Sequence, residues 1–205
     1  MRIKDVLNSI ETTACYFIAE IGINHDGDIS IAKQMIDQAV ISGANAVKFQ
    51  KRDINVVYSQ EYLNEPRQSV YGNTQRALKE GLEFDLEQYR CLMDYAHARN
   101  IDFIASAWDE VSAQEMADIN IDCIKIAAPC LTDIKLLHKI NSFGIPCIVS
   151  FGMCDIDQAL AAYARLDRIK KIVLHCVSSY PAGDNDESVT KRVTKRLSIC
   201  TFAKF

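Results

Sequence analysis

The stretch IDFIASAWDEVSAQEMADINIDCIKIA, residues 101–127, decides the fold. It holds two short and almost wholly apolar runs, 101–107 and 121–127, on either side of a segment with helical character, 111–120. Strands that are covered on both faces read as continuous apolar runs rather than as alternating ones. The stretch therefore predicts one strand–helix–strand unit of a parallel β-sheet.

The same unit recurs along most of the chain. We expect strands at 16–22, 45–50, 101–107, 121–127, 145–152 and 170–178, with helices at 29–43, 85–100, 111–120, 132–144 and 155–166. Asp85, which begins a capping box with Gln88, and Thr132 are predicted to cap helix N-termini. Residues 51–84 show no such period, and we expect them to form a long irregular loop.

Polar side chains indicate which parallel fold this is. They fall at the C-terminal ends of nearly all the predicted strands, as Glu20, Lys48, Gln50, Ser106, Lys125, Ser150 and His175. An open doubly wound sheet gathers such residues at one switch point, whereas a closed barrel places them at many strand ends. Since no G-x-G-x-x-G follows the first strand, the sequence predicts an α/β fold of the (β/α)8 TIM-barrel type. Only six strands are legible, so we expect an incomplete barrel.

The composition excludes several classes of protein. The 205 residues include 23 basic and 27 acidic side chains, and a net charge of −4 gives no general attraction for nucleic acid. No stretch reaches the roughly 18 apolar residues of a membrane span, and the N-terminus lacks the apolar core of a signal peptide. The eight Cys form no C-x-x-C pair. We therefore expect a cytoplasmic protein with reduced thiols.

Three charged residues interrupt the apolar strands. Glu20 lies where a carboxylate needs a partner, and it forms either a structural ion pair or part of a ligand site. Lys48 and Lys125 hold equivalent positions in two other strands. Two such lysines indicate a phosphate or a carboxylate as their counter-charge. The alternative is a Schiff-base lysine of the kind found in barrel aldolases.

Uncharged polar side chains accompany these charges. Gln50 is two residues from Lys48 and therefore projects from the same face of its strand. Ser106 and Ser150 end two further strands and supply hydrogen-bond donors for an anion. Residues 24–27 form either a simple turn before the first helix or part of a ligand mouth.

Five motifs together resemble a known family. They are FIAEIGINHDGD, AVKFQ, IKIA, VSFGM and LHCVSSYP, in this order, within residues 14–183. This pattern is similar to that of the N-acetylneuraminate (sialic acid) synthase family, whose most specific segments here are AEIGINHDG and HCVSSYP. The resemblance implies a (β/α)8 barrel followed by a small antifreeze-like domain, in a domain-swapped homodimer.

The resemblance also implies a reaction and a set of roles. Phosphoenolpyruvate would condense with N-acetylmannosamine or a related hexose to give a 2-keto-3-deoxy nonulosonic acid, with release of phosphate. A divalent metal, manganese or magnesium, would polarise the aldehyde. By motif matching, Glu20 would be catalytic, in proton transfer or water activation. The remaining roles would be phosphoenolpyruvate binding for Lys48, Ser106, Lys125 and Ser150, and sugar binding for Gln50 and Tyr180.

The chain also departs from the family pattern. Ala128 and Cys130 stand where the family has a phosphate-binding serine and a sugar-binding glutamate, which indicates a different acceptor sugar. The family's metal-binding histidines and its antifreeze-like domain fall beyond the last residue of this chain. We therefore expect a truncated barrel domain, residues 1–183, an irregular basic tail, residues 184–205, and little activity from the chain alone. An inactive or regulatory ligand-binding remnant and a Schiff-base aldolase are the alternative functions.

Overall fold

The computed structural model describes residues 1–8, 15–176 and 202–203 of the chain. Six predicted strands are present, and each begins one or two residues after its predicted start. They are β1 (Ile18–Gly22), β2 (Ala46–Lys51), β5 (Asp102–Ala107), β6 (Cys123–Ile126), β7 (Cys147–Phe151) and β8 (Lys171–His175). The prediction of repeated strand–helix units is confirmed.

The strands form one sheet in the order β8-β7-β6-β5-β2-β1, and β9 (Phe202–Ala203) extends it beyond β1. Every neighbouring pair is parallel. In the described part of the chain β8 and β9 are the two edges of this sheet, so the described barrel is not closed. Of the segment 184–205, which was expected to be an irregular tail, the structure describes β9 alone.

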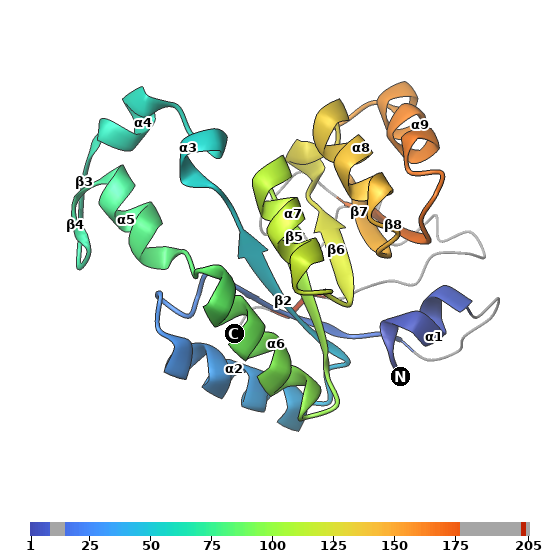
Figure 1. The fold of residues 1–205 in the computed structure, drawn as a ribbon, viewed down its shortest axis with the longest axis horizontal. Coiled ribbons are helices and arrows are strands. Elements are labelled where there is room, and N and C mark those ends of the chain that lie inside the picture. The colour runs from blue at the N-terminus through green and yellow to red at the C-terminus, as the bar shows by residue number, and fades with distance from the viewer. Residues whose placement is uncertain (9–14, 177–201, 204–205) are drawn as a thin grey trace, which may run out of the picture.

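The connecting helices lie along the outer face of the sheet (Figure 1). They are α2 (Ile29–Ile41), α6 (Leu86–His97), α7 (Glu110–Asp118), α8 (Ile134–Ser142) and α9 (Ile156–Arg165), with a 3-10 turn, η1 (Ala128–Cys130), after β6. The predicted capping box of Asp85 and Gln88 is present at α6. The predicted cap Thr132 is wrong, because α8 begins one residue later and Asp133 accepts the hydrogen bond from the Leu136 N–H at 3.1 Å.

The two faces of the sheet carry different side chains. Residues of odd register, such as Val47, Phe49 and Phe103, pack outward against the helices in the larger apolar core. Their neighbours Ala46 and Ile104 point inward and belong to a second, smaller apolar cluster. This alternation is the period of two expected of a β-strand. It leaves the inner face beyond the second cluster for the polar residues at the strand ends.

The N-terminal helix α1 (Ile3–Asn8) covers the inner face at the N-terminal ends of the strands. Its anchor is Asp102, which is 1% exposed at the start of β5. The Asp102 carboxylate accepts hydrogen bonds from the Ile3 N–H at 2.6 Å and the Tyr16 hydroxyl at 2.5 Å, and pairs with Arg2 at 2.6 Å. Burial, together with the Asp102 carboxylate, raises the pKa of Tyr16 far above its usual range, so that its hydroxyl remains a donor. One end of the inner face is thus closed.

An arm of short elements, residues 54–82, replaces the irregular loop predicted at 51–84. It contains α3 (Ile54–Val57), α4 (Gln60–Asn64), the antiparallel strands β3 (Pro66–Ser69) and β4 (Gly72–Thr74), and α5 (Gln75–Leu82). The prediction of a loop was wrong because these elements are short and bury few apolar residues, so they carry no hydrophobic period. Figure 1 shows the arm extending from the C-terminal end of β2.

The arm is packed against the turn that follows β1. A Cβ atom on Gly27, whose φ is +65°, would lie 2.0 Å from the carbonyl oxygen of Gly81. A Cβ atom on Gly81 would lie 2.2 Å from the Tyr71 ring, and the Tyr71 hydroxyl donates to the Asp26 carbonyl. Such close approaches admit only glycine.

The described helices give no sign of a transmembrane segment. None of them combines the length and the apolar character that crossing a bilayer requires.

Candidate active site

Glu20, Lys48 and Ser106 form a connected polar group on the inner face. Glu20 and Lys48 are register partners on β1 and β2, and the Lys48 Nζ lies 2.7 Å from the Glu20 Oε2. The same Nζ donates to the Ser106 Oγ of β5 at 3.0 Å. Lys48 and Ser106 are buried, and the Glu20 side chain is 17% exposed. Three neighbouring strands therefore bring one carboxylate, one ammonium group and one hydroxyl together, as the strand period predicted.

Lys125 adds a second ammonium group to this face. It is the register partner of Ser106 on β6 and is 7% exposed. Among the described residues no carboxylate lies within ion-pair distance of it. Burial, and next the charge of Lys48, lowers the pKa of Lys125 to about 8, against the smaller opposing effects of Cys176, Glu20 and Cys130. The site thus holds two ammonium groups for one carboxylate, and the second lacks a direct partner in the described structure.

The end of β1 brings Glu20 close to Gln50. A register shift between Glu20 and Gly22 marks a bulge, and Gly22 has a φ of +58°. A Cβ atom on Gly22 would lie 3.1 Å from the Glu20 Oε1 and 3.4 Å from the Gln50 Nε2. The Glu20 Oε1 is buried and has no hydrogen-bond partner in the described structure. Gly22 therefore keeps open the space between these two polar groups, a role that the sequence pattern did not reveal.

The other predicted site residues are less closely connected. Ser150 is buried on β7 in the same alternation as Ile148, which faces inward, but no hydrogen bond joins it to Glu20, Lys48 or Ser106. Tyr180 lies outside the described residues. Only the backbone of His175, at the end of β8, is described.

The turn after β1 is a structural element. His25 is buried and stacks on Phe84 with ring centroids 4.1 Å apart. Its Nδ1 accepts a hydrogen bond from the Gly27 N–H at 3.1 Å. Burial lowers the pKa of His25 to about 4, so the ring is neutral near pH 7. Of the two interpretations of residues 24–27, the geometry of His25 supports the turn.

Two further cations at the end of β2 are paired with carboxylates. Lys51 lies 3.3 Å from Glu115 and donates to the Phe84 carbonyl at 2.9 Å. Arg52 donates to Glu83 at 2.7 Å. These pairs join β2 to the segment after the arm and to α7. Sequence analysis missed them, because ion pairs between distant segments leave no local pattern. Their full pairing contrasts with Lys125.

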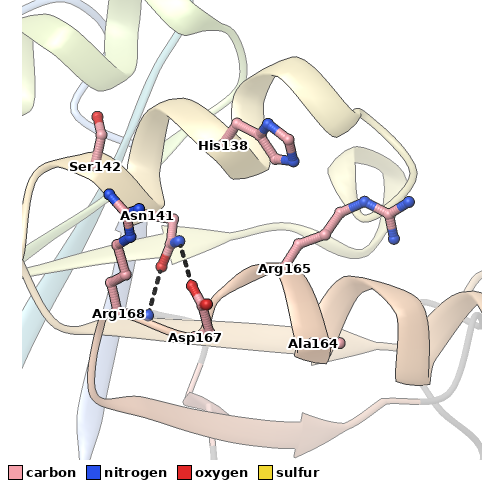
Figure 2. A pocket seen from close by; sticks show the side chains of 7 residues that line it. All are labelled: His138, Asn141, Ser142, Ala164, Arg165, Asp167 and Arg168. Atoms are coloured by element: carbon pink, nitrogen blue, oxygen red, sulfur yellow. Dashed lines mark hydrogen bonds between the residues drawn. The ribbon is translucent and has the colours of Figure 1, made fainter.

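A surface cavity of about 350 Å³ lies between α8 and α9 (Figure 2). Asn141 links its two sides, because its side chain donates to Asp167 at 2.8 Å and accepts from the Arg168 N–H at 3.0 Å. Arg165 lies in the last turn of α9, where a cation complements the helix dipole. None of the inner-face residues lines this cavity. We therefore assign it no part in the polar site.

The described residues do not fit the divalent metal that the resemblance implies. Within residues 1–8, 15–176 and 202–203, no three His, Cys, Asp or Glu side chains come together where a metal could bind. Cys130 follows β6 near Lys125, but burial raises the pKa of its thiol to about 11, so it is a neutral group. No role in this site is therefore assigned to a metal.

Comparison with known proteins gives one family match. The model of the NeuB family matches residues 35–196. The chain is 33% identical over 194 residues to N-acetylneuraminate-9-phosphate synthase of Drosophila melanogaster, covering 92% of this chain and 52% of that protein. It is 34% identical over 189 residues to N,N'-diacetyllegionaminic acid synthase of Legionella pneumophila, covering 84% and 51%. The chain thus spans about half the length of these curated relatives.

Solved structures agree in fold. The N-acetylneuraminic acid synthetase of Leptospira borgpetersenii superposes with a TM-score of 0.74 at 28% identity, covering 85% of this chain and 58% of that one. A truncated 3-deoxy-D-arabino-heptulosonate 7-phosphate synthase of Thermotoga maritima gives a TM-score of 0.55 at 15% identity, covering 78% and 50%, and is similar in fold alone. The TIM-barrel type of the described sheet is thereby confirmed.

Proposed function

The chain belongs to the NeuB family, and we propose that it carries the phosphoenolpyruvate site of a nonulosonic acid synthase. Phosphoenolpyruvate would condense with an N-acetylmannosamine-like hexose to form a 2-keto-3-deoxy nonulosonic acid and inorganic phosphate. The observation that carries this proposal is the inner-face placement of Lys48 and Lys125 beside a single carboxylate, Glu20. A multiply charged anion is the natural ligand of such a group.

The binding roles follow from the unequal surroundings of the two lysines. Lys48 is already paired with Glu20, whereas Lys125 is buried without a carboxylate at ion-pair distance in the described structure. A phosphate or carboxylate beside Lys125 would supply the missing counter-charge. Ser106, which touches Lys48, and Ser150 on β7 would donate hydrogen bonds to the same anion. Gln50, next to Glu20 across Gly22, would contact the sugar.

The chemistry forms one carbon–carbon bond and breaks one carbon–oxygen bond. The enol carbon of phosphoenolpyruvate attacks the aldehyde carbon, and water adds to the cationic centre that remains at C2. The bond between C2 and the phosphate oxygen then breaks, and the oxygen of the water becomes the keto oxygen. Of the two protons of the water, one goes to the former aldehyde oxygen and the other to the phosphate. Glu20, hydrogen-bonded to the Lys48 ammonium, would carry the first.

The setting proposed for the reaction is the cytoplasm. Seven described cysteines are free, as is typical of a reducing compartment. A divalent metal would need ligands other than a set of the described residues, and none of the steps above involves it.

Release of phosphate tests the proposal. The purified chain would be incubated with phosphoenolpyruvate, manganese, and N-acetylmannosamine, its 6-phosphate or a diacetamido-trideoxyhexose in turn. We expect phosphate release that depends on one of these sugars and is lost in Glu20→Gln. Lys48→Met and Lys125→Met should each weaken phosphoenolpyruvate binding by about tenfold or more, a loss of roughly 1.4 kcal/mol.

The alternative functions give different results in the same experiment. Thermal stabilisation by phosphoenolpyruvate without phosphate release would identify a ligand-binding protein rather than a synthase. Unchanged binding in both lysine variants would remove the basis of the proposal, because neither ammonium group would then contact the anion.

A further inference from the structure

Lys125 has the surroundings of a nucleophilic amine as well as those of an anion ligand. We propose that Lys125 forms a reversible imine with small 2-keto acids, an activity distinct from the condensation proposed above. Its amine is on the inner face of β6, beside the hydroxyl of its register partner Ser106. In the described structure no carboxylate holds it as a permanently paired ammonium group.

The Lys48–Glu20 pair provides the second requirement, a group that can move protons beside the amine. The Lys48 Nζ lies 2.7 Å from Glu20 and 3.0 Å from the Ser106 Oγ, so the pair reaches the strand that neighbours Lys125. Its charges act on Lys125 strongly enough to affect the pKa of that residue. The Glu20 Oε1 has no hydrogen-bond partner in the described part of the chain and is therefore uncommitted.

The titration of Lys125 supports this inference. Burial and the neighbouring Lys48 charge lower the pKa of Lys125 to about 8. A measurable fraction of the amine is then neutral at pH 7.5, whereas an exposed lysine is almost wholly protonated. Lowering the pKa of a lysine by desolvation and by a neighbouring cation is the general way in which a Schiff-base amine is activated.

The step balances without an oxidant or a reductant. The lone pair of the neutral amine attacks the keto carbon, a carbon–nitrogen bond forms, and the keto oxygen takes up a proton to become a hydroxyl group. Glu20 supplies a proton to that hydroxyl, which leaves as water, and the nitrogen proton returns to the carboxylate. The Lys48 ammonium group would meanwhile hold the carboxylate of the keto acid.

Reductive trapping tests the inference with pyruvate as the probe. The protein would be incubated with pyruvate and sodium cyanoborohydride between pH 6.5 and 9, then examined by intact mass and peptide mapping. We expect one adduct, with the mass of pyruvate less one water plus two hydrogens, on the peptide that contains Lys125. Its yield should rise about tenfold across this range, following a group with a pKa near 8. Exposed Lys135 on α8 is the internal control and should label at least tenfold less at pH 7.5.

Variants separate the possible outcomes. Lys125→Met and Lys125→Arg should abolish the adduct, whereas Lys135→Met should leave it unchanged. Labelling of Lys125 no greater than that of Lys135, or labelling that moves to Lys48, would overturn the inference. The proposed function is tested separately, by adding phosphoenolpyruvate. An adduct that phosphoenolpyruvate fails to diminish would leave the imine in place but contradict phosphoenolpyruvate binding at Lys125.

Discussion

Lys48 and Lys125 lie on one face of the sheet in different electrostatic surroundings. Lys48 has a carboxylate at 2.7 Å, and Lys125 has none at ion-pair distance in the described structure. Removing one partner of a buried pair leaves an uncompensated charge, whereas removing an unpaired buried charge relieves a desolvation penalty. The two lysines should therefore contribute to the free energy of unfolding with opposite signs.

We expect Lys48→Met to destabilise the protein by about 2–3 kcal/mol, because Glu20 is left without its cation. Lys125→Met should be neutral or stabilising. Urea unfolding at pH 7 measures both changes. The matched control is the double variant Lys48→Met/Glu20→Gln, in which no charge is left unpaired and most of the lost stability should return. Equal destabilisation by the two single variants would contradict the unequal pairing.

The titration of Lys125 predicts a pH dependence of stability. Its pKa is about 8 in the folded protein and 10.5 in its usual surroundings, so between these values the unfolded chain binds more protons. The free energy of unfolding should therefore rise with pH from about 8 to 10.5, by on the order of 3 kcal/mol from this group. Subtracting the curve of Lys125→Met from that of the parent protein isolates the effect. A difference that stays flat over this range would show that the Lys125 amine is not desolvated.

Gly22 is predicted to matter for chemistry beyond its backbone conformation. A Cβ atom there meets the Glu20 Oε1 at 3.1 Å. Gly144, with a φ of +71° and nothing within 4 Å of a Cβ atom, is the matched control. Both alanine variants should cost about 1 kcal/mol of stability, but Gly22→Ala alone should lower phosphate release, by about 100-fold. Equal activities would show that Glu20 tolerates displacement.

At the scale of elements, the buried strands and their helices were predictable and the arm was not. Each strand is apolar on its outer side and lies against a helix of period 3.6, so sequence periods report both. The same period placed Glu20, Lys48 and Ser106 on one face before any coordinates were considered. The arm depends instead on single side-chain caps, such as those of Ser59 and Thr74, and on contacts with a distant turn. Contacts between segments far apart in sequence leave no periodic trace.

The glycine contact of the arm gives a prediction for the whole element. Gly81→Ala places a methyl group 2.2 Å from the Tyr71 ring, so the arm should separate from the turn after β1. Hydrogen exchange across residues 54–82 should accelerate about tenfold, while exchange in β5 and β6 stays unchanged. Adding Tyr71→Ala removes the obstructing ring and should restore part of the protection. If Gly81→Ala alone leaves exchange in the arm at the parent rate, the contact does not hold the arm.

At the scale of the molecule, the inner face has an apolar end and a polar end. Helix α1 closes the apolar end through Asp102, and Glu20, Lys48 and Lys125 line the other end, at the strand termini. The sequence predicted the polar end, because charged residues stand out in apolar strands. It could not predict that α1 covers the other end, since six residues with two buried side chains carry too weak a pattern. The same strands connect the two ends, so loss of the anchor should weaken the whole sheet.

Asp102→Ala tests whether the two ends unfold together. The substitution leaves the buried Ile3 N–H and Tyr16 hydroxyl without their acceptor, and the expected loss is about 3 kcal/mol. Trp108, the single tryptophan, follows β5 at the opposite end from Asp102, so its fluorescence reports on the polar end. In urea, the fluorescence and circular dichroism transitions should shift together, because one sheet spans both ends. Asp94→Ala, at an exposed position of α6, should leave both midpoints unchanged. A tryptophan transition that keeps its midpoint while the circular dichroism transition moves would show that the α1 end unfolds by itself.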